Sequence, residues 1–179
     1  MPINLELKAK IVSPQRILRI CRRIAKPAGI LHQTDTYFFM KKGRLKLREF
    51  SQGEAELIYY SRNEKRGARL SRYERLDVSN PMSMKKVLGN MLGILAVVKK
   101  NRSVFIYKGK ARIHVDRVQG LGNFIEFEVF YKADRRNAQR TYNELLESFN
   151  IHPIDLISCS YSDLRNRSRE QLKNSRKGK

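Results

Sequence analysis

The feature of this sequence that most constrains its fold is a two-residue alternation in which one face carries charges of both signs. It recurs in four segments, NLELKAK at 4–10, RLKLR at 44–48, RIHVD at 112–116 and FIEFEV at 124–129. Side chains of a strand point alternately to opposite faces, so each segment has one apolar and one ionic face. A sheet with one face in solvent shows the same alternation of apolar and polar residues, so such a sheet is one interpretation. The density of Arg, Lys and Glu favours another, a barrel with charged faces inside and apolar faces outside.

In such a barrel, basic side chains would hold an anion and carboxylates would hold its metal. Hard cations prefer carboxylate oxygens, while Arg grips phosphate through two hydrogen bonds and Lys acts as a point charge. The side chains on the ionic faces are Glu6, Lys8, Lys10, Arg44, Lys46, Arg48, Arg112, His114, Asp116, Glu126 and Glu128. For His114, both an inward proton carrier and a structural histidine are compatible with the pattern.

Turn residues and apolar periodicity divide the chain into eight strands and several helices. We expect strands at 3–11, 30–40, 44–50, 55–61, 70–78, 95–107, 111–118 and 124–131. We expect helices from Pro14 to about Lys26, from Pro81 to Gly89 or Gly93, from Asp134 to Phe149, and a last helical turn near 154–164. Strands joined mostly by tight turns form an antiparallel sheet that can curl and close. The predicted fold is therefore α+β, an eight-stranded antiparallel β-barrel with helices packed outside.

Length and composition favour one basic globular domain. The 179 residues suit a single domain, and 41% hydrophobic residues can form a core. The net charge of +21 indicates a polyanionic partner such as a nucleotide, polyphosphate, nucleic acid or anionic membrane. Helix-turn-helix, zinc-finger and clustered base-stacking patterns are missing from the sequence, which weighs against the common nucleic-acid-binding classes.

The remaining signals concern location and the end of the chain. Cys21 and Cys159 fit no paired pattern, as in free thiols of a reducing compartment, and no signal peptide or apolar span is evident. We therefore expect a soluble cytoplasmic protein without a membrane partner. Residues 1–164 form the expected domain, and 165–179, with seven Lys or Arg and one Glu, form a basic flexible tail. That tail could contact nucleic acid or direct the protein to the nucleus.

Several segments resemble, in order, the motifs of the CYTH family, the triphosphate tunnel metalloenzymes, and within it the class IV adenylate cyclase branch. NLELKAK is similar to the family's N-terminal ExExK signature, and DTYF at 35–38 and LKLRE at 45–49 to its second and third strands. VVKKNRSVF at 97–105 carries a KxR element, and RIHVDRVQGLGNFIEFE at 112–128 resembles the longest signature. The resemblance extends over about residues 3–132.

The resemblance implies an eight-stranded tunnel that binds a triphosphate with Mg²⁺ or Mn²⁺. By this resemblance, the metal ligands are Glu6, Asp116, Glu126 and Glu128. The implied catalytic residues are Lys8, Lys100 and Arg102, and the substrate-binding residues are Lys8, Lys46, Arg48, Lys100, Arg102 and Arg112. Two departures stand out, since Asn4 replaces the first signature glutamate and a family lysine near 62–69 has only Arg62 or Arg69 as a substitute.

Three functions follow from these parts. In an adenylate cyclase, the ribose 3′-hydroxyl attacks the α-phosphorus of ATP, giving cyclic AMP and pyrophosphate. In a triphosphatase, water attacks the terminal phosphorus. Both depend on in-line positioning and charge neutralisation. Because Asn4 lacks the charge of the family glutamate, the third alternative is a non-catalytic binder of nucleotide, polyphosphate or RNA.

Overall fold

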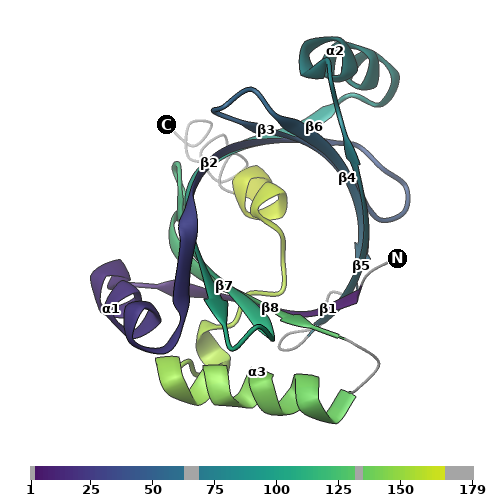
Figure 1. Cartoon of the computed structure of the whole chain (residues 1–179). Helices are drawn as coiled ribbons and strands as arrows, with labels where there is room; N and C mark the ends of the chain where they lie inside the picture. The colour runs from purple at the N-terminus through teal and green to yellow at the C-terminus, as the bar shows by residue number, and fades with distance from the viewer. Residues whose placement is uncertain (1–2, 63–68, 132–134, 168–179) are drawn as a thin grey trace, which may run out of the picture.

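The strands of this protein close into one antiparallel barrel (Figure 1). The computed structural model describes residues 3–62, 69–131 and 135–167, and its strands follow one another around the barrel in the order β1-β5-β4-β3-β2-β6-β7-β8. Their bounds are β1 Ile3–Ile11, β2 Lys26–Phe38, β3 Arg44–Phe50, β4 Ala55–Arg62, β5 Arg69–Asp77, β6 Ile94–Tyr107, β7 Ala111–Val118 and β8 Gly122–Phe130. β1 pairs with both β5 and β8, which closes the sheet and confirms the predicted fold class.

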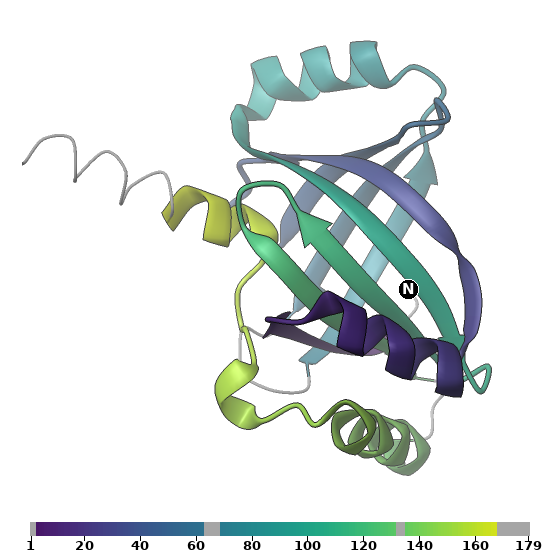
Figure 2. The same ribbon diagram turned by 90° about the vertical axis from the view of Figure 1, so that its left-hand side faces the viewer.

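Helices lie outside the barrel and at one of its ends. The bounds are α1 Pro14–Ile24, α2 Pro81–Leu92, α3 Arg135–Phe149 and the 3₁₀ turn η1 Pro153–Asp155, followed by a C-terminal helix at 161–167. In Figure 1, α1 and α3 flank the lower part of the barrel and α2 lies above it, whereas Figure 2 shows the C-terminal helix at one end. Among the described helices, none combines the length and apolar character that crossing a membrane requires.

The outward faces of the strands form the apolar core, as the alternation predicts. Leu7, Ile113 and Phe127 are fully buried on this face, and Ile17 of α1 and Leu145 of α3 pack against them. α2 covers a smaller cluster around Phe38 and Leu47. Burial of the apolar faces under helices leaves the ionic faces to line the interior.

The first helix ends earlier than predicted, and the second strand begins earlier. α1 ends at Ile24, and Lys26 already belongs to β2. The residue before a proline is disfavoured in helical conformation, and Pro27 follows Lys26. β2 then crosses an irregularity between Pro27 and Gly29, where the positive φ of 116° at Gly29 suits glycine. The KPAG segment contains proline and glycine, which are typical of loops, but it forms part of β2 with a bulge.

The C-terminal segment, residues 156–167, departs most from the prediction of a helical turn near 154–164. After η1 the chain is extended, with Leu156 bridging Ala9 and the Ile157 amide donating to the Lys8 carbonyl at 2.9 Å. It then enters the barrel end, where Tyr161 packs edge-on against Phe124 with ring centroids 5.0 Å apart. Of the predicted tail, 165–167 belong to the C-terminal helix, and 168–179 lie outside the described residues.

Truncation of the outward core tests this arrangement. We expect Phe127→Ala to lower the free energy of unfolding by about 3–5 kcal/mol, because its fully buried ring packs under α3. Val12→Ala is the matched control, since Val12 is 99% exposed and should change stability by less than about 0.5 kcal/mol. Urea denaturation measures both variants, and equal midpoints for the two would contradict an outward apolar core.

Candidate active site inside the barrel

The ionic faces of the strands meet inside the barrel, where strand pairing sets opposite charges side by side. On β1 and β8, Lys8 stands opposite Glu126, and on β6 and β7, Arg102 stands opposite Asp116. Lys8, Arg102 and Asp116 are almost completely buried. Lys10, predicted on the same face, lies exposed towards the end of β1. The interior is therefore a packed network of ion pairs.

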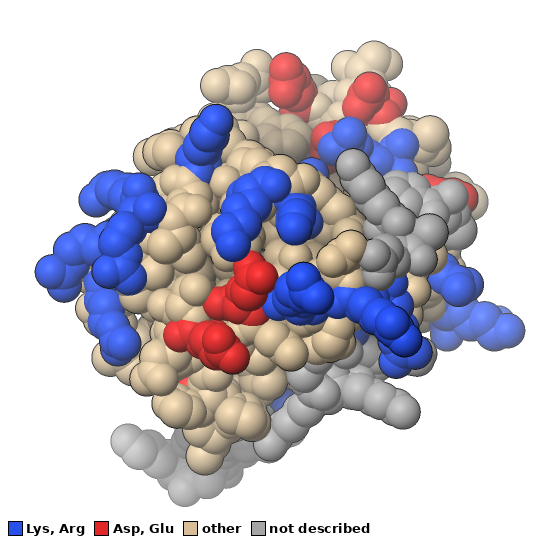
Figure 3. All heavy atoms as spheres, turned by 60° about the horizontal axis from the view of Figure 1, so that its bottom comes forward, with Lys and Arg blue, Asp and Glu red and all other residues tan. Residues whose placement is uncertain are grey.

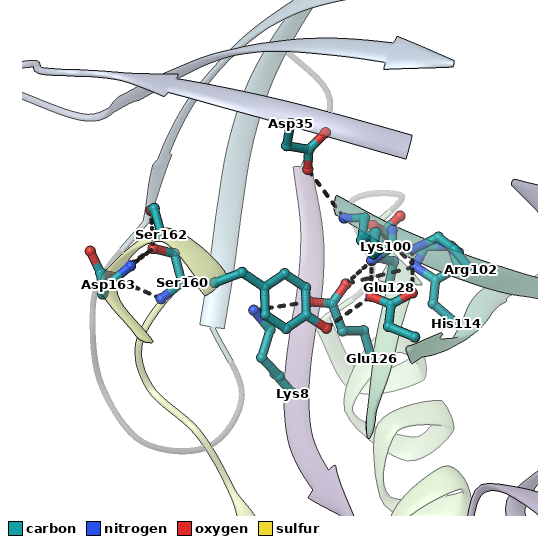
Figure 4. Close-up of polar contacts among 12 residues, drawn as sticks. Lys8, Asp35, Lys100, Arg102, His114, Glu126, Glu128, Ser160, Ser162 and Asp163 are labelled. Atoms are coloured by element: carbon teal, nitrogen blue, oxygen red, sulfur yellow. Dashed lines mark hydrogen bonds and ion pairs between the residues drawn. The ribbon is translucent and has the colours of Figure 1, made fainter. Parts of the chain in front are cut away.

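Asp35 on β2 is the centre of one half of this network, and Figure 4 shows its contact with Lys100. Its carboxylate is fully buried and lies 3.2 Å from the Nζ atoms of both Lys46 and Lys100. The Arg48 guanidinium donates two hydrogen bonds to the same carboxylate, at 2.7 and 2.9 Å. Burial alone would raise the pKa of Asp35, but the charges of Arg48, Lys100 and Lys46 outweigh it and hold that pKa well below its usual range.

Arg102 on β6 is the centre of the other half. Its guanidinium donates to both oxygens of Asp116, at 2.7 and 2.5 Å, and also contacts Glu126. Glu126 in turn forms an ion pair with Lys8 at 3.0 Å. Burial opposes ionisation of Glu126, yet Lys8 and Arg102 hold its pKa well below the usual range. These groups stay charged because each carboxylate has a cationic partner.

Glu128 and His114 form the outer part of the same wall. Arg112 donates a hydrogen bond from Nε to Glu128 at 2.9 Å, and one of its terminal nitrogens lies 2.8 Å from the same carboxylate oxygen in an ion pair. The Nδ1 atom of His114 lies 3.7 Å from Glu128 and 4.0 Å from Glu126, beyond hydrogen-bond distance. Burial, and next the charge of Arg102, lower the pKa of His114 to about 4, so the imidazole is neutral at pH 7.

Two of the interior lysines, Lys46 and Lys100, have lowered pKa values. Burial lowers the pKa of Lys46 to about 7, with the charge of Arg48 adding to the effect. Burial and the charge of Arg102 lower the pKa of Lys100 to about 8. Crowded cations with lowered pKa values favour binding of an additional anion, because an anion relieves their mutual repulsion.

A cavity of about 130 Å³ lies between these groups. Glu6, Lys8, Arg48, Lys100, Arg102 and Glu128 are among the residues that line it. Tyr161 of the C-terminal segment closes one side, with its ring centroid 3.5 Å from the Lys8 Nζ and 5.2 Å from the Lys100 Nζ. Its hydroxyl donates to Asp116 at 2.8 Å. A phosphate-sized anion in this cavity would therefore lie between basic side chains and acidic side chains, with the ring of Tyr161 on one side.

Two interior positions bear on the departures from the family signature. Asn4 is buried and lines the cavity, between Ser71 of β5 and Phe130 of β8. Arg69, one of the two substitutes considered for the family lysine, is 2% exposed, lines the same cavity and donates to the Ser158 carbonyl. The loop at 63–68 lies outside the described residues.

Sequence reasoning missed Asp35 and Tyr161. Asp35 was noted only within the DTYF segment, although its alternation with Tyr37 places both on the inward face of β2. Its role depends on cations from β3 and β6, which lie far apart in sequence. Tyr161 reaches the site only because the C-terminal segment enters the barrel, and no local pattern indicates that path.

Comparison with known proteins identifies the class of this barrel. The CYTH domain profile matches residues 2–161, so the chain belongs to the CYTH domain family. None of the curated protein sequences matches it.

Solved structures share the fold at low sequence identity. A protein of Pyrococcus horikoshii superposes with a TM-score of 0.81 at 21% identity, over 90% of this chain and 98% of the other. A candidate adenylate cyclase of Vibrio parahaemolyticus gives 0.75 at 22% identity, over 92% and 98%. A candidate adenylyl cyclase of Hippeastrum, described as having a dominant triphosphatase activity, gives 0.63 at 13% identity, over 84% and 89%.

The acidic wall fits the divalent metal that the CYTH family generally uses. Glu6 and Glu128 stand opposite each other on β1 and β8, and Glu126 lines the same cavity. Within the described ranges, no three His, Cys, Asp or Glu side chains converge as a ready metal-binding group. Mg²⁺ commonly binds through one or two carboxylates while water and substrate phosphates complete its coordination. The glutamates therefore fit a metal shared with a phosphate chain.

Removal of the central carboxylate of the cationic wall provides a first test of the site. We expect Asp35→Asn to lower the free energy of unfolding by about 3–5 kcal/mol, because it leaves Lys46, Arg48 and Lys100 buried without their counter-ion. Inorganic triphosphate should raise the melting temperature of this variant more than that of the natural sequence, since the anion replaces the lost charge. Thermal unfolding with and without triphosphate measures both effects. Equal increases in the melting temperatures of the variant and of the natural sequence would contradict anion binding beside Lys46, Arg48 and Lys100.

The lowered pKa values of Lys46 and Lys100 predict a pH dependence of anion binding. A bound anion raises both pKa values, so binding takes up protons from about pH 7 upward, until the pH reaches the raised pKa values of the bound state. Affinity should fall as the pH rises through this range, because the free protein loses its lysine charges. Calorimetry in buffers of different ionisation enthalpy measures the protons, and a Lys46→Met, Lys100→Met double variant corrects for protons of the ligand itself. Identical proton uptake in both proteins would refute this explanation.

Proposed function

We propose that this chain is a metal-dependent enzyme that hydrolyses a triphosphate inside its barrel. The observation that carries the proposal is the group of cations Lys46, Arg48, Lys100 and Arg102, brought together around the cavity with a glutamate-rich wall facing them. Fixed cations in a water-poor site stabilise charge that develops during phosphoryl transfer. CYTH proteins generally process triphosphates, and membership of the family supports the same class of substrate.

The size of the cavity favours a bare phosphate chain over a complete nucleotide. Sites that enclose larger organic ligands usually measure roughly 300–1,000 Å³, compared with about 130 Å³ here. A purine and ribose would need more space than this cavity encloses, whereas a phosphate chain needs only its polar walls. The dominant triphosphatase activity named for the Hippeastrum protein agrees with this choice.

In the proposed reaction, water oxygen bonds to the terminal phosphorus of the triphosphate as the bond from that phosphorus to the bridging oxygen breaks. The products are orthophosphate and, from inorganic triphosphate, pyrophosphate. Lys8, Lys100 and Arg102 would hold phosphoryl oxygens in line and neutralise the charge on the leaving group. Lys46, Arg48 and Arg112 would bind the rest of the chain. Asp35 would act as a positioning residue, because it fixes cations from β3 and β6.

Glu6, Glu126 and Glu128 would hold Mg²⁺ or Mn²⁺, which when bound would polarise the phosphoryl oxygens as a Lewis acid. The role proposed for Asp116 differs from that of a metal ligand. Its oxygens accept hydrogen bonds from Arg102 and Tyr161, and it is fully buried. We assign it the positioning of Arg102.

Two other functions remain as alternatives. Adenylate cyclase activity is favoured by Tyr37 and Tyr60, which line the cavity and offer aromatic surface to an adenine. A non-catalytic binder is favoured by Asn4, which faces the cavity without the charge of the family glutamate.

Product analysis separates these functions. With Mg²⁺ or Mn²⁺, the purified chain should release orthophosphate from inorganic triphosphate. We expect Glu126→Gln and Arg102→Met each to lower kcat/KM by about 100-fold or more, since Glu126 would hold the metal and Arg102 would hold phosphoryl oxygens. Glu144→Gln is the matched control, because Glu144 lies on α3 outside the barrel, where it accepts hydrogen bonds from the exposed Lys108 and from the hydroxyl of the buried Tyr107.

Other outcomes would overturn the hydrolase proposal. Cyclic AMP and pyrophosphate from ATP would establish the cyclase. Triphosphate binding without any product would establish the binder. Full activity in folded Glu126→Gln and Arg102→Met variants would show that the reaction occurs elsewhere.

A further inference from the structure

The charge inside the barrel does not account for the net charge of the protein. Among the residues that the structure describes, seven interior cations face five interior carboxylates, a difference of two from a total of +21, so 19 excess positive charges of the chain are not part of this network. The cations are Lys8, Lys46, Arg48, Arg69, Lys100, Arg102 and Arg112, and the carboxylates are Glu6, Asp35, Asp116, Glu126 and Glu128. Binding of a polyanion to the outer surface would explain why the chain carries so many positive charges that are not part of the interior network.

Helix α1 concentrates part of this charge. Arg16, Arg19, Arg22 and Arg23 are all exposed, while Ile17 of the same helix is buried. The positions 16, 19 and 23 fall on one face by the helical repeat. Figure 3 shows Lys and Arg gathered at its left edge, the side on which α1 lies in Figure 1. We call this group of four arginines the α1 basic row.

Acidic residues of the described part of the chain do not neutralise the α1 basic row. The sequence holds no Asp or Glu from residue 7 to residue 34. Within the part of the chain that the structure describes, none of the four arginines forms an ion pair. They are therefore available to an external anion.

Helix stability does not explain the α1 basic row. Arg22 and Arg23 lie in the last turn, where cations interact favourably with the helix dipole. Arg16 lies in the first turn, where a cation is unfavourable. The pairs Arg16–Arg19, Arg19–Arg22 and Arg19–Arg23 place like charges three or four residues apart, which destabilises a helix.

We propose that the α1 basic row binds the phosphate backbone of a nucleic acid. All four residues are arginine, which forms paired hydrogen bonds with phosphate oxygens. From Arg16 to Arg23 the helix rises by about 10.5 Å, and each strand of a B-form duplex advances about 3.4 Å along the duplex axis per phosphate, so the row covers the axial length of about three base-pair steps. The apolar residues Ile17 and Cys21 are buried against the barrel, so α1 has no free apolar face to insert into a membrane.

The test is fluorescence anisotropy with the full chain and two probes, a 20-nucleotide RNA strand and a DNA duplex of equal length. Both carry 5′-hydroxyl ends, so that the tunnel has no triphosphate to engage. A variant with Arg16→Gln, Arg19→Gln, Arg22→Gln and Arg23→Gln retains good helix formers. The matched control removes the same charge from exposed lysines elsewhere, by Lys41→Gln, Lys42→Gln, Lys86→Gln and Lys99→Gln.

We expect the α1 variant to bind RNA or duplex about tenfold or more weakly at low salt, with a salt slope reduced by about 3. The lysine control should weaken binding about threefold or less, and both variants should hydrolyse triphosphate at the natural rate. Whichever probe binds tighter identifies the kind of nucleic acid. Arg19→Glu, compared with Lys86→Glu, repeats the test if the fourfold variant fails to fold.

Two results would overturn the proposal. Equal losses in the α1 variant and the lysine control would show that only net charge matters. Polyglutamate that competes as well as RNA at equal charge would point to an acidic protein partner. Because triphosphate turnover is measured separately, failure here leaves the proposed tunnel reaction untouched.

Discussion

The structure depends on one constraint, that charges enclosed in a barrel must find partners there. An isolated buried charge costs several kcal/mol, and only close opposite charges with hydrogen bonds offset that cost. Asp35 and Arg102 meet this requirement for the two halves of the interior, each bonded to groups from other strands. The same pairs orient the cations that a phosphate chain would use, so folding and binding depend on one network.

Closure of the barrel makes this network possible. β1 pairs with β8, whose glutamates then face Lys8 and, across the interior, the cations of β3 and β6. The C-terminal segment adds Tyr161 over Lys8 and Lys100 and closes one side of the cavity. A site built from opposite walls can hold an anion against cations while carboxylates stay close enough to share a metal with it.

The sequence predicted the strands and the inward side chains well, because a two-residue period determines both. Lys8 and Lys46 were predicted on ionic faces, Lys100 and Arg102 were indicated by the family resemblance, and all four are buried inside the barrel. Contacts between distant segments were not predictable. Asp35 meets its partners only after β2, β3 and β6 assemble, and Tyr161 depends on an extended C-terminal segment that follows η1. The start of β2 beyond Pro27 was also outside the predicted strand at 30–40, since proline and glycine usually interrupt strands.

A crystal structure of the chain with inorganic triphosphate and Mn²⁺ tests the central claim most directly, because the anomalous signal of manganese locates the metal. The account predicts phosphate oxygens within hydrogen-bond distance of Lys100 and Arg102, and a manganese peak beside Glu126 and Glu128. Phosphate bound only on the outer surface, with the Asp35 and Arg102 pairs unchanged and no metal in the barrel, would contradict it.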